Sequence, residues 1–140
     1  MHTIVVGVDG SEPSMRALRF AARLAQDLSD TRLVVAHARH VPALWAPRHV
    51  PEAEFSDVLD AAERFVREAA EHELSQGDVP WSIQSRDGEP SNVLRDIAHE
   101  SDATFVVVGR SGWSTVQELL LGSVSNRLVH RADLNVLLVD

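Results

Sequence analysis

The chain of 140 residues contains no cysteine and no lysine. Without cysteine it cannot form a disulfide, a thiolate metal site or a cysteine nucleophile. Because all 13 basic residues are arginine, a lysine-dependent phosphate loop and a Schiff-base mechanism are also excluded. No apolar run reaches the roughly 18–20 residues that a membrane span needs, and no cationic segment precedes the short apolar N-terminus as it would in a signal peptide. We therefore expect a cytoplasmic protein that does not bind membranes.

Positive charge is scarce as well, since the net charge is −8. This balance opposes nonspecific binding to nucleic acid or anionic lipid, so neither is expected as a partner. A hydrophobic content of 44 % and a charged content of 24 % are typical of globular proteins and argue against disorder. The length, with no repeat, low-complexity tract or linker, predicts a single domain over residues 1–140.

Five segments have the pattern of β-strands. Residues 3–8, 32–38 and 104–108 are apolar and rich in β-branched side chains, as in strands that are buried on both faces. Residues 81–86 alternate apolar and polar side chains, which is typical of an edge strand. The fifth predicted strand is the apolar segment from Asn135 to Val139.

Helical patterns separate these strands. Ser11 and Pro13 form a helix start signal, and apolar residues then recur at helical spacing to about residue 28. Residues 40–53 contain three prolines and show no periodicity, so an irregular loop is expected there. The remaining helices are predicted over residues 55–77, 93–98, 116–121 and 124–129.

Strands that alternate with helices imply parallel pairing through right-handed crossovers. The first and fourth of these strands look the most buried, which suggests that they lie at the centre of the sheet. The sequence therefore predicts an α/β, Rossmann-like fold, a five-stranded parallel sheet of order 3-2-1-4-5 with helices on both faces. In this order the first and fourth strands are neighbours, and the direction of winding reverses between them. Ligands of open α/β sheets bind beyond the carboxyl ends of the strands at such a point.

Two unusual segments follow those two strands, namely Asp9-Gly10-Ser11 and the stretch from Gly109 to Ser125. Gly109 and Gly112 flank a turn in which glycine permits positive φ and lets a ligand approach the backbone closely. Gly122 interrupts an apolar helical stretch, where glycine costs about 1 kcal/mol relative to alanine. That cost makes sense if a helix begins at Gly122.

A helix that begins at Gly122 would present free N–H groups together with the hydroxyls of Ser123 and Ser125. Such a cradle binds an anion without lysine, and polyphosphate is its natural occupant. Each glycine also has a structural alternative, as part of a plain turn or a plain helix break. Asp9 has one too, because an aspartate after a strand often caps the following helix.

The second segment carries a family resemblance. Gly109-Arg-Ser-Gly112, followed after nine residues by Gly122-Ser123, is similar to the nucleotide signature of the ATP-binding branch of the universal stress proteins. The opening sequence IVVGVDGSEPSMRALRFAARLA resembles the first strand, loop and helix of that family. His37, the turn at residues 88–90, and the segments DATFVVVG and VLLVD are similar as well. The resemblance covers the whole chain.

The resemblance implies an adenine nucleotide alpha hydrolase-like fold that binds ATP, with Mg²⁺ on the phosphates although no carboxylate cage for the metal is evident. Asp9 would contact the nucleoside and Ala38 would border the adenine, whereas Arg110 could reach either phosphate or solvent. The full set of implied binding residues is Val8, Asp9, Gly10, Ala38, Val108, Gly109, Arg110, Gly112, Gly122, Ser123, Val124 and Ser125. It also implies a homodimer in which the strand from Asn135 to Val139 pairs with its copy.

Three functions follow from this interpretation. The first is a regulatory ATP-binding dimer whose state is recognised by a downstream protein partner in a stress response. The second is a slow ATP hydrolase that uses the same site, and the third is a nucleotide-free interaction dimer. Hydrolysis needs an aligned water and charge stabilisation at the γ-phosphate. The sequence offers no Walker lysine and no evident base beyond Asp9, so it favours the first function and no catalytic residue is predicted.

Overall fold

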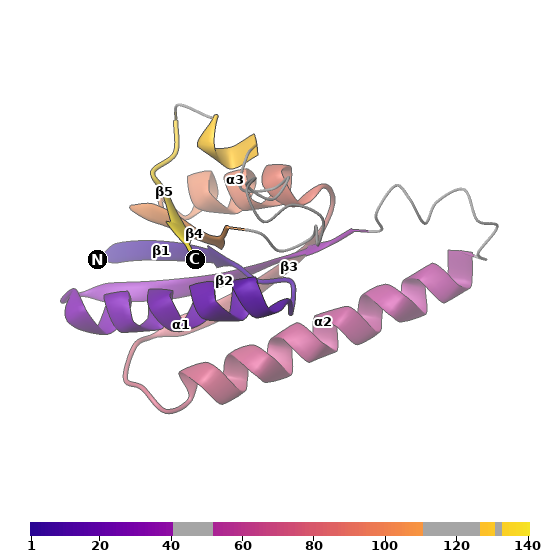
Figure 1. The fold of residues 1–140 in the computed structure, drawn as a ribbon, viewed down its shortest axis with the longest axis horizontal. Helices are drawn as coiled ribbons and strands as arrows, with labels where there is room; N and C mark the ends of the chain where they lie inside the picture. The colour runs from indigo at the N-terminus through magenta and orange to yellow at the C-terminus, as the bar shows by residue number, and fades with distance from the viewer. Residues whose placement is uncertain (41–51, 111–126, 131–132) are drawn as a thin grey trace.

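The computed structural model describes residues 1–40, 52–110, 127–130 and 133–140. Its five strands form one parallel sheet of order β3-β2-β1-β4-β5, which confirms the predicted order and the Rossmann-like α/β class (Figure 1). The strands are β1 (His2–Gly7), β2 (Thr31–Arg39), β3 (Trp81–Asp87), β4 (Phe105–Gly109) and β5 (Val136–Val139). The strand with the alternating pattern, β3, lies at an edge as predicted.

The helices cover both faces of this sheet. They are α1 (Glu12–Asp27), α2 (Glu52–Leu74) and α3 (Pro90–Glu100). In Figure 1, α1 and α2 lie on one side of the strands and α3 lies on the other. Because successive side chains of a strand point to opposite faces, Ile4 and Val6 join the core beneath α1 and α2, whereas Val5 joins the core beneath α3.

The helix boundaries correct the predictions at α2. This helix begins at Glu52, so the irregular loop expected over residues 40–53 is wrong for its last two residues, and the helix ends at Leu74 rather than near Gly77. The nearby prolines obscured the helical pattern at its start. Of the two helices predicted over residues 116–121 and 124–129, only residues 127–129 lie within the described part, and these are helical.

Helix α1 starts where the sequence predicts. Ser11 is its N-cap, the N–H of Ser14 donates to Ser11 Oγ at 3.4 Å, and Pro13 occupies the first turn. An N-cap hydroxyl accepts from one of the helix N–H groups that have no partner within the helix, which contributes about 1 kcal/mol. The helix buries Ala17, Leu18 and neighbouring small residues against the sheet.

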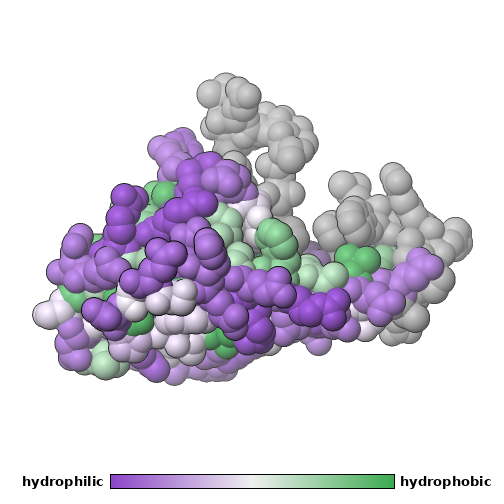
Figure 2. Space-filling view, turned by 90° about the horizontal axis from the view of Figure 1, so that it is seen from below, coloured by the Kyte–Doolittle hydropathy of each residue, from purple (hydrophilic) through white to green (hydrophobic). Residues whose placement is uncertain are grey.

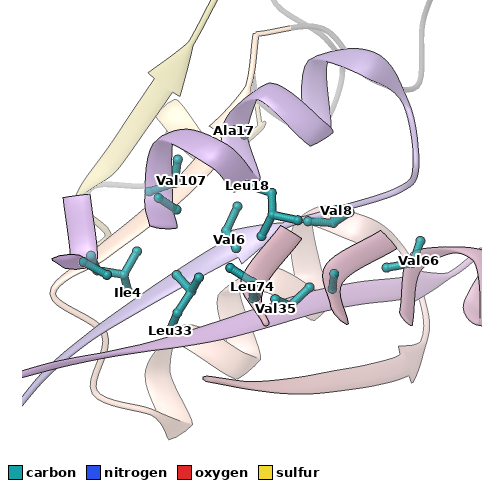
Figure 3. Packing of buried hydrophobic residues seen from close by; sticks show 13 residues of the cluster. Ile4, Val6, Val8, Ala17, Leu18, Leu33, Val35, Val66, Leu74 and Val107 are labelled. Carbon is teal, nitrogen blue, oxygen red and sulfur yellow. The ribbon is translucent and has the colours of Figure 1, made fainter. Parts of the chain in front are cut away.

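The larger core lies between the sheet and the pair α1 and α2. Figure 3 shows Leu18 of α1 and Val66 and Leu74 of α2 around the sheet residues Val6 and Val35. Leu18, Val66, Val6 and Val35 are completely buried and Leu74 nearly so. Burial of an aliphatic side chain of this size contributes about 1.5–3 kcal/mol. These contacts hold the C-terminal half of α2 on the sheet.

The N-terminal half of α2 is less covered. Val58 in this half is 46 % exposed, and Phe65, just past the middle of the helix, is 59 % exposed. The face that Figure 2 shows is mostly hydrophilic, with hydrophobic side chains gathered in small areas. Within the described ranges, no helix has the length and the apolar character that crossing a membrane requires.

Arg39 ties this half of α2 to the carboxyl end of β2. Its guanidinium donates to Asp60 at 2.9 Å and to Glu63 at 2.5 Å on α2, and to Asp87 of β3 at 2.9 Å. The hydrogen bonds to Asp60 and Glu63 raise the pKa of Arg39 well above its usual value, although desolvation opposes the shift. Three carboxylates around one guanidinium therefore fix α2 beside the end of the sheet where a ligand is expected.

Candidate functional site

The carboxyl ends of β1, β2 and β4 meet at the point where the winding of the sheet reverses. Seven of the predicted binding residues lie at these ends or directly after them, namely Val8, Asp9, Gly10, Ala38, Val108, Gly109 and Arg110. The five others, Gly112, Gly122, Ser123, Val124 and Ser125, lie outside the described residues. The described part of the predicted site thus comes from three neighbouring strands that are distant in sequence.

Packing at these three strand ends is tight. The N–H of Val8 donates to the carbonyl oxygen of Ala36 at 3.0 Å, and a Cβ on Gly7 would lie 3.3 Å from Cγ1 of Val108. Val8, Ala38 and Val108 are 3 %, 7 % and 4 % exposed, so their side chains are chiefly part of the core. The surface of the site comes instead from the residues that follow these strands.

Asp9 organises the turn between β1 and α1. Its Oδ1 accepts a hydrogen bond from the N–H of Ser11 at 2.8 Å and a second, short one from the Ser11 hydroxyl. Ser11 itself caps α1, so the alternative in which Asp9 caps the helix directly is wrong. Both of these hydrogen bonds use Oδ1 of Asp9. The Asp9 carboxylate as a whole stays partly exposed at the end of β1.

Gly10 occupies the tip of this turn with φ at +87°. Residues with a side chain rarely adopt this conformation, because the Cβ crowds the backbone. A Cβ at Gly10 would also lie 3.0 Å from two ring carbons of Phe65 on α2. Both backbone geometry and packing therefore require glycine here.

The structure gives a reason why position 109 needs a glycine, and the sequence did not reveal it. A Cβ at this position would lie 2.7 Å from both the carbonyl carbon and the carbonyl oxygen of Pro13. The close approach that glycine permits is therefore made by the first turn of α1. The contact locks the end of β4 to the turn that Asp9 organises.

The sequence allows the Arg110 side chain to reach either a bound phosphate or solvent. Its backbone N–H donates to the carbonyl oxygen of Val139 at 2.9 Å, and its guanidinium pairs with Asp140 at 3.1 Å. The Arg110 side chain is 51 % exposed. In this structure Arg110 therefore joins the start of the second segment to the end of β5, and its guanidinium faces solvent and Asp140.

Glu89 is a residue of this end of the sheet that the sequence analysis missed. Its carboxylate caps α3 by accepting from the N–H groups of Ser91 and Asn92, each at 3.2 Å, and it pairs with Arg127 at 3.0 Å. Partial burial raises the pKa of Glu89, but the hydrogen bonds from Ser91 and Asn92 and the charge of Arg127 outweigh burial and leave the pKa below its usual value. The position directly before Pro90 was the available signal, although glutamate is not a preferred N-cap.

A second hollow, of about 640 Å³, lies at the opposite end of the sheet. It is bordered by the ends of α1 and α2 and by Asp30 and Asp78. Carbonyl groups at helix C-terminal ends carry partial negative charge, and the two carboxylates add to it. The N-terminal ammonium of Met1 also borders this hollow and pairs with Asp30 at 3.0 Å, so it offsets one of the two carboxylates.

Comparisons with known proteins agree with this fold. The sequence model described as the universal stress protein family matches residues 1–140. Universal stress protein Rv1636 of Mycobacterium tuberculosis is 33 % identical over 147 residues, which cover 98 % of this chain and 94 % of that protein.

Two solved structures extend the comparison. The crystal structure of a universal stress protein in complex with cAMP has a TM-score of 0.74 and 29 % identity, covering 99 % of this chain and 97 % of that one. The universal stress protein UspA from Lactobacillus plantarum has a TM-score of 0.81 and 21 % identity, with 99 % and 97 % coverage, and supports the fold alone.

The Gly109 contact predicts an unequal response to two glycine substitutions. Gly109→Ala should lower the free energy of unfolding by about 1–3 kcal/mol, because its Cβ would press on the backbone of Pro13. Gly77→Ala is the matched control, since its Cβ would meet only Nε2 of the flexible Gln26 side chain, also at 2.7 Å. Urea denaturation measures both. Equal losses in the two variants would contradict the rigid contact at Gly109.

The Glu89 cap predicts a pH dependence. Since the folded state lowers the pKa of Glu89, its stabilising contribution is fully present above the pKa of the unfolded chain and is lost as pH falls through the folded pKa. Glu89→Gln should therefore cost about 1 kcal/mol at neutral pH, and this difference should shrink below about pH 4. Denaturation of both proteins across this pH range tests it. A difference that stays constant with pH would show that the charge of Glu89 is not the stabilising feature.

Proposed function

The chain belongs to the universal stress protein family, and we propose that it is a regulatory dimer that binds ATP, accompanied by Mg²⁺, at the carboxyl ends of β1, β2 and β4. The observation that carries this proposal is that Asp9 organises the turn after β1, while the first turn of α1 approaches Gly109 at the end of the neighbouring β4, where the winding of the sheet reverses. Ligands of open α/β sheets bind at such a point.

A nucleotide as ligand is supported by the comparison with known structures. The relative in complex with cAMP aligns along nearly the whole of this chain. Its ligand has the adenosine and phosphate chemistry that the signature from Gly109 to Ser125 predicts. We favour ATP within this class because Gly112, Gly122 and the hydroxyls of Ser123 and Ser125 suit a polyphosphate better than a single phosphate.

The charges at the crevice support one orientation of the ligand. Carboxylates accept hydrogen bonds but repel phosphate, so Asp9 and Glu89 favour the hydroxyl and amine groups of a nucleoside. We therefore infer that the nucleoside lies beside Asp9 and Ala38. The phosphates would lie toward Gly112, Gly122 and the serines that follow, where Mg²⁺ and backbone N–H groups offset their charge.

Binding without rapid hydrolysis is the favoured activity. Among the charged side chains at the described strand ends, Glu89 caps α3, Arg110 pairs with Asp140, and one carboxylate oxygen of Asp9 holds Ser11. A general base must instead reach a water that is aligned on the γ-phosphate. Because these side chains take part in hydrogen bonds and ion pairs of the fold, they support a nucleotide-dependent regulator over a slow ATP hydrolase that uses the same site.

The proposed dimer forms through β5. This strand lies at one edge of the sheet and pairs with β4 along a single side in the described structure. Leu138 is 38 % exposed on that edge. An apolar edge strand is a template for pairing with another strand, and a second copy of β5 would cover it by antiparallel pairing. The predicted strand began at Asn135, and β5 itself begins at Val136.

The ATP proposal predicts that adenine nucleotide is released when the purified protein is denatured, or that ATP with Mg²⁺ raises the melting temperature of the nucleotide-free protein. Gly122→Asp should abolish this effect, because a carboxylate beside the phosphates repels them. Gln76→Asp adds the same charge at the opposite end of the sheet and should bind ATP like the parent. Chromatography and thermal shift measure both. Absence of nucleotide together with absence of a shift in the parent protein would refute ATP binding.

The dimer proposal predicts that Leu138→Glu yields monomers in light scattering, since charge repulsion and desolvation oppose strand pairing. Leu138 is a better choice than Leu137 or Val139, which pack against the core beneath α1. Val58→Glu adds the same charge at a comparably exposed position on α2 and should remain dimeric. An unchanged mass for Leu138→Glu would exclude β5 from the interface.

A further inference from the structure

We propose that His37 and Ser14 are positioning residues for the nucleotide site, because together they fix the peptide between Val8 and Asp9 and thereby aim the Asp9 carboxylate. Neither side chain is among the binding residues that the family resemblance implies. The inference rests on the proposed function for its purpose, although the geometry that it describes can be tested without any nucleotide.

His37 holds one side of this peptide. Its imidazole lies on β2 and is 2 % exposed, and Nδ1 is 3.1 Å from the carbonyl oxygen of Val8. A carbonyl oxygen only accepts hydrogen bonds, so Nδ1 carries the proton and donates it. Val8 N–H already donates to Ala36, which ties the end of β1 to β2. The bond from His37 therefore acts on the next peptide, beyond the regular ladder.

Ser14 holds the other side of the same peptide. The N–H of Asp9 donates to Oγ of Ser14 at 3.3 Å, and the Ser14 hydroxyl donates in turn to the carbonyl oxygen of Ser11 at 2.9 Å. Ser14 is 5 % exposed in the first turn of α1. Ser11 caps α1 and also donates to the Asp9 carboxylate. The hydrogen bonds therefore form a closed chain from the Asp9 N–H to Ser14, from Ser14 to Ser11, and from Ser11 to the Asp9 side chain.

The placement of these two side chains is unusual for residues that only pack. The buried polar residues in the described part are Thr3, Ser14, Thr31, His37 and Ser91. Two of these five bond to the two ends of one peptide group. Burial of a polar group is unfavourable unless it is hydrogen-bonded, so the pair constrains the peptide orientation. The orientation of this peptide sets the direction in which the Asp9 side chain points from the end of β1. A nucleoside that binds to the Asp9 carboxylate would therefore be affected by a change in this orientation.

A matched pair of variants separates the hydrogen bond from the volume of the ring. His37→Leu and His37→Asn both branch at Cγ, but only the asparagine can donate from the atom that replaces Nδ1. His37→Leu should weaken ATP binding about fivefold in calorimetry, the effect of losing ~1 kcal/mol of hydrogen bonding. His37→Asn should restore most of that loss. Equal weakening in the two variants would overturn the proposal.

Amide hydrogen exchange tests the geometry without nucleotide. In His37→Leu and in Ser14→Ala, the protection of the Asp9 amide should fall at least severalfold, while amides in the middle of β1 and β2 keep theirs. Unchanged protection at Asp9, or an equal fall throughout the sheet, would show that His37 is only a packing residue. Selective loss at Asp9 with no ATP binding by the parent protein would support the positioning role and refute the ATP proposal instead.

A double-mutant cycle then tests whether the effect passes through Asp9. In an Asp9→Asn background, His37→Leu should change the ATP dissociation constant by less than about twofold, because the group that it positions has already been altered. The same fivefold loss in both backgrounds would overturn the link between His37 and Asp9.

Discussion

The turn after β1 is confined from two sides, and the geometry of the crevice depends on this confinement. On one side the ring of Phe65 on α2 abuts Gly10, whose φ of +87° suits glycine. On the other side the backbone of Pro13 approaches Gly109 so closely that no Cβ fits between them. The approach of Pro13 to Gly109 is backbone against backbone, whereas the Phe65 ring is largely exposed and is the softer of the two neighbours. Together with the hydrogen bonds from Ser11, these neighbours hold the Asp9 carboxylate at the end of β1.

Much of this frame could be predicted from the sequence. The strands could be found because buried apolar runs and the alternation at residues 81–86 are local patterns. Connection rules gave the parallel pairing, and the apolar character of the first and fourth strands gave the order 3-2-1-4-5. The cap at Ser11 with Pro13 behind it was equally local. Such features can be predicted without knowing which side chains that are distant in sequence contact each other.

The features that were missed depend on contacts between distant residues. Arg39 meets carboxylates on α2 and β3, and Glu89 meets Arg127, and no spacing rule links such residues. The sequence predicts that Gly109 lets a ligand approach the backbone, but the group that approaches it in the structure is Pro13 of the same chain. The start of α2 at Glu52 was missed because the prolines before it suggested a loop. Tertiary contacts, rather than local preference, decided each of these cases.

These physical features fit the proposed nucleotide site, which would work without lysine. Backbone N–H groups and Mg²⁺ would balance the phosphates, and the carboxylates of Asp9 and Glu89 would keep the nucleoside at the other end of the crevice. Among the described residues, Glu89 and Arg110 have partners within the fold, and one carboxylate oxygen of Asp9 holds Ser11. Such a site suits a protein whose bound state is recognised by a partner more than one that turns substrate over.

The most direct measurement of the central claim is an NMR titration of the nucleotide-free, ¹⁵N-labelled protein with ATP and Mg²⁺. We expect the largest shift changes at the amides of Asp9, Gly10, Gly109 and Arg110, where the carboxyl ends of β1 and β4 meet. The amides of Gln76 and Asp78 at the opposite end of the sheet should not move. Spectra that do not change, or changes that cluster at the opposite end, would contradict a nucleotide site at the reversal of the sheet.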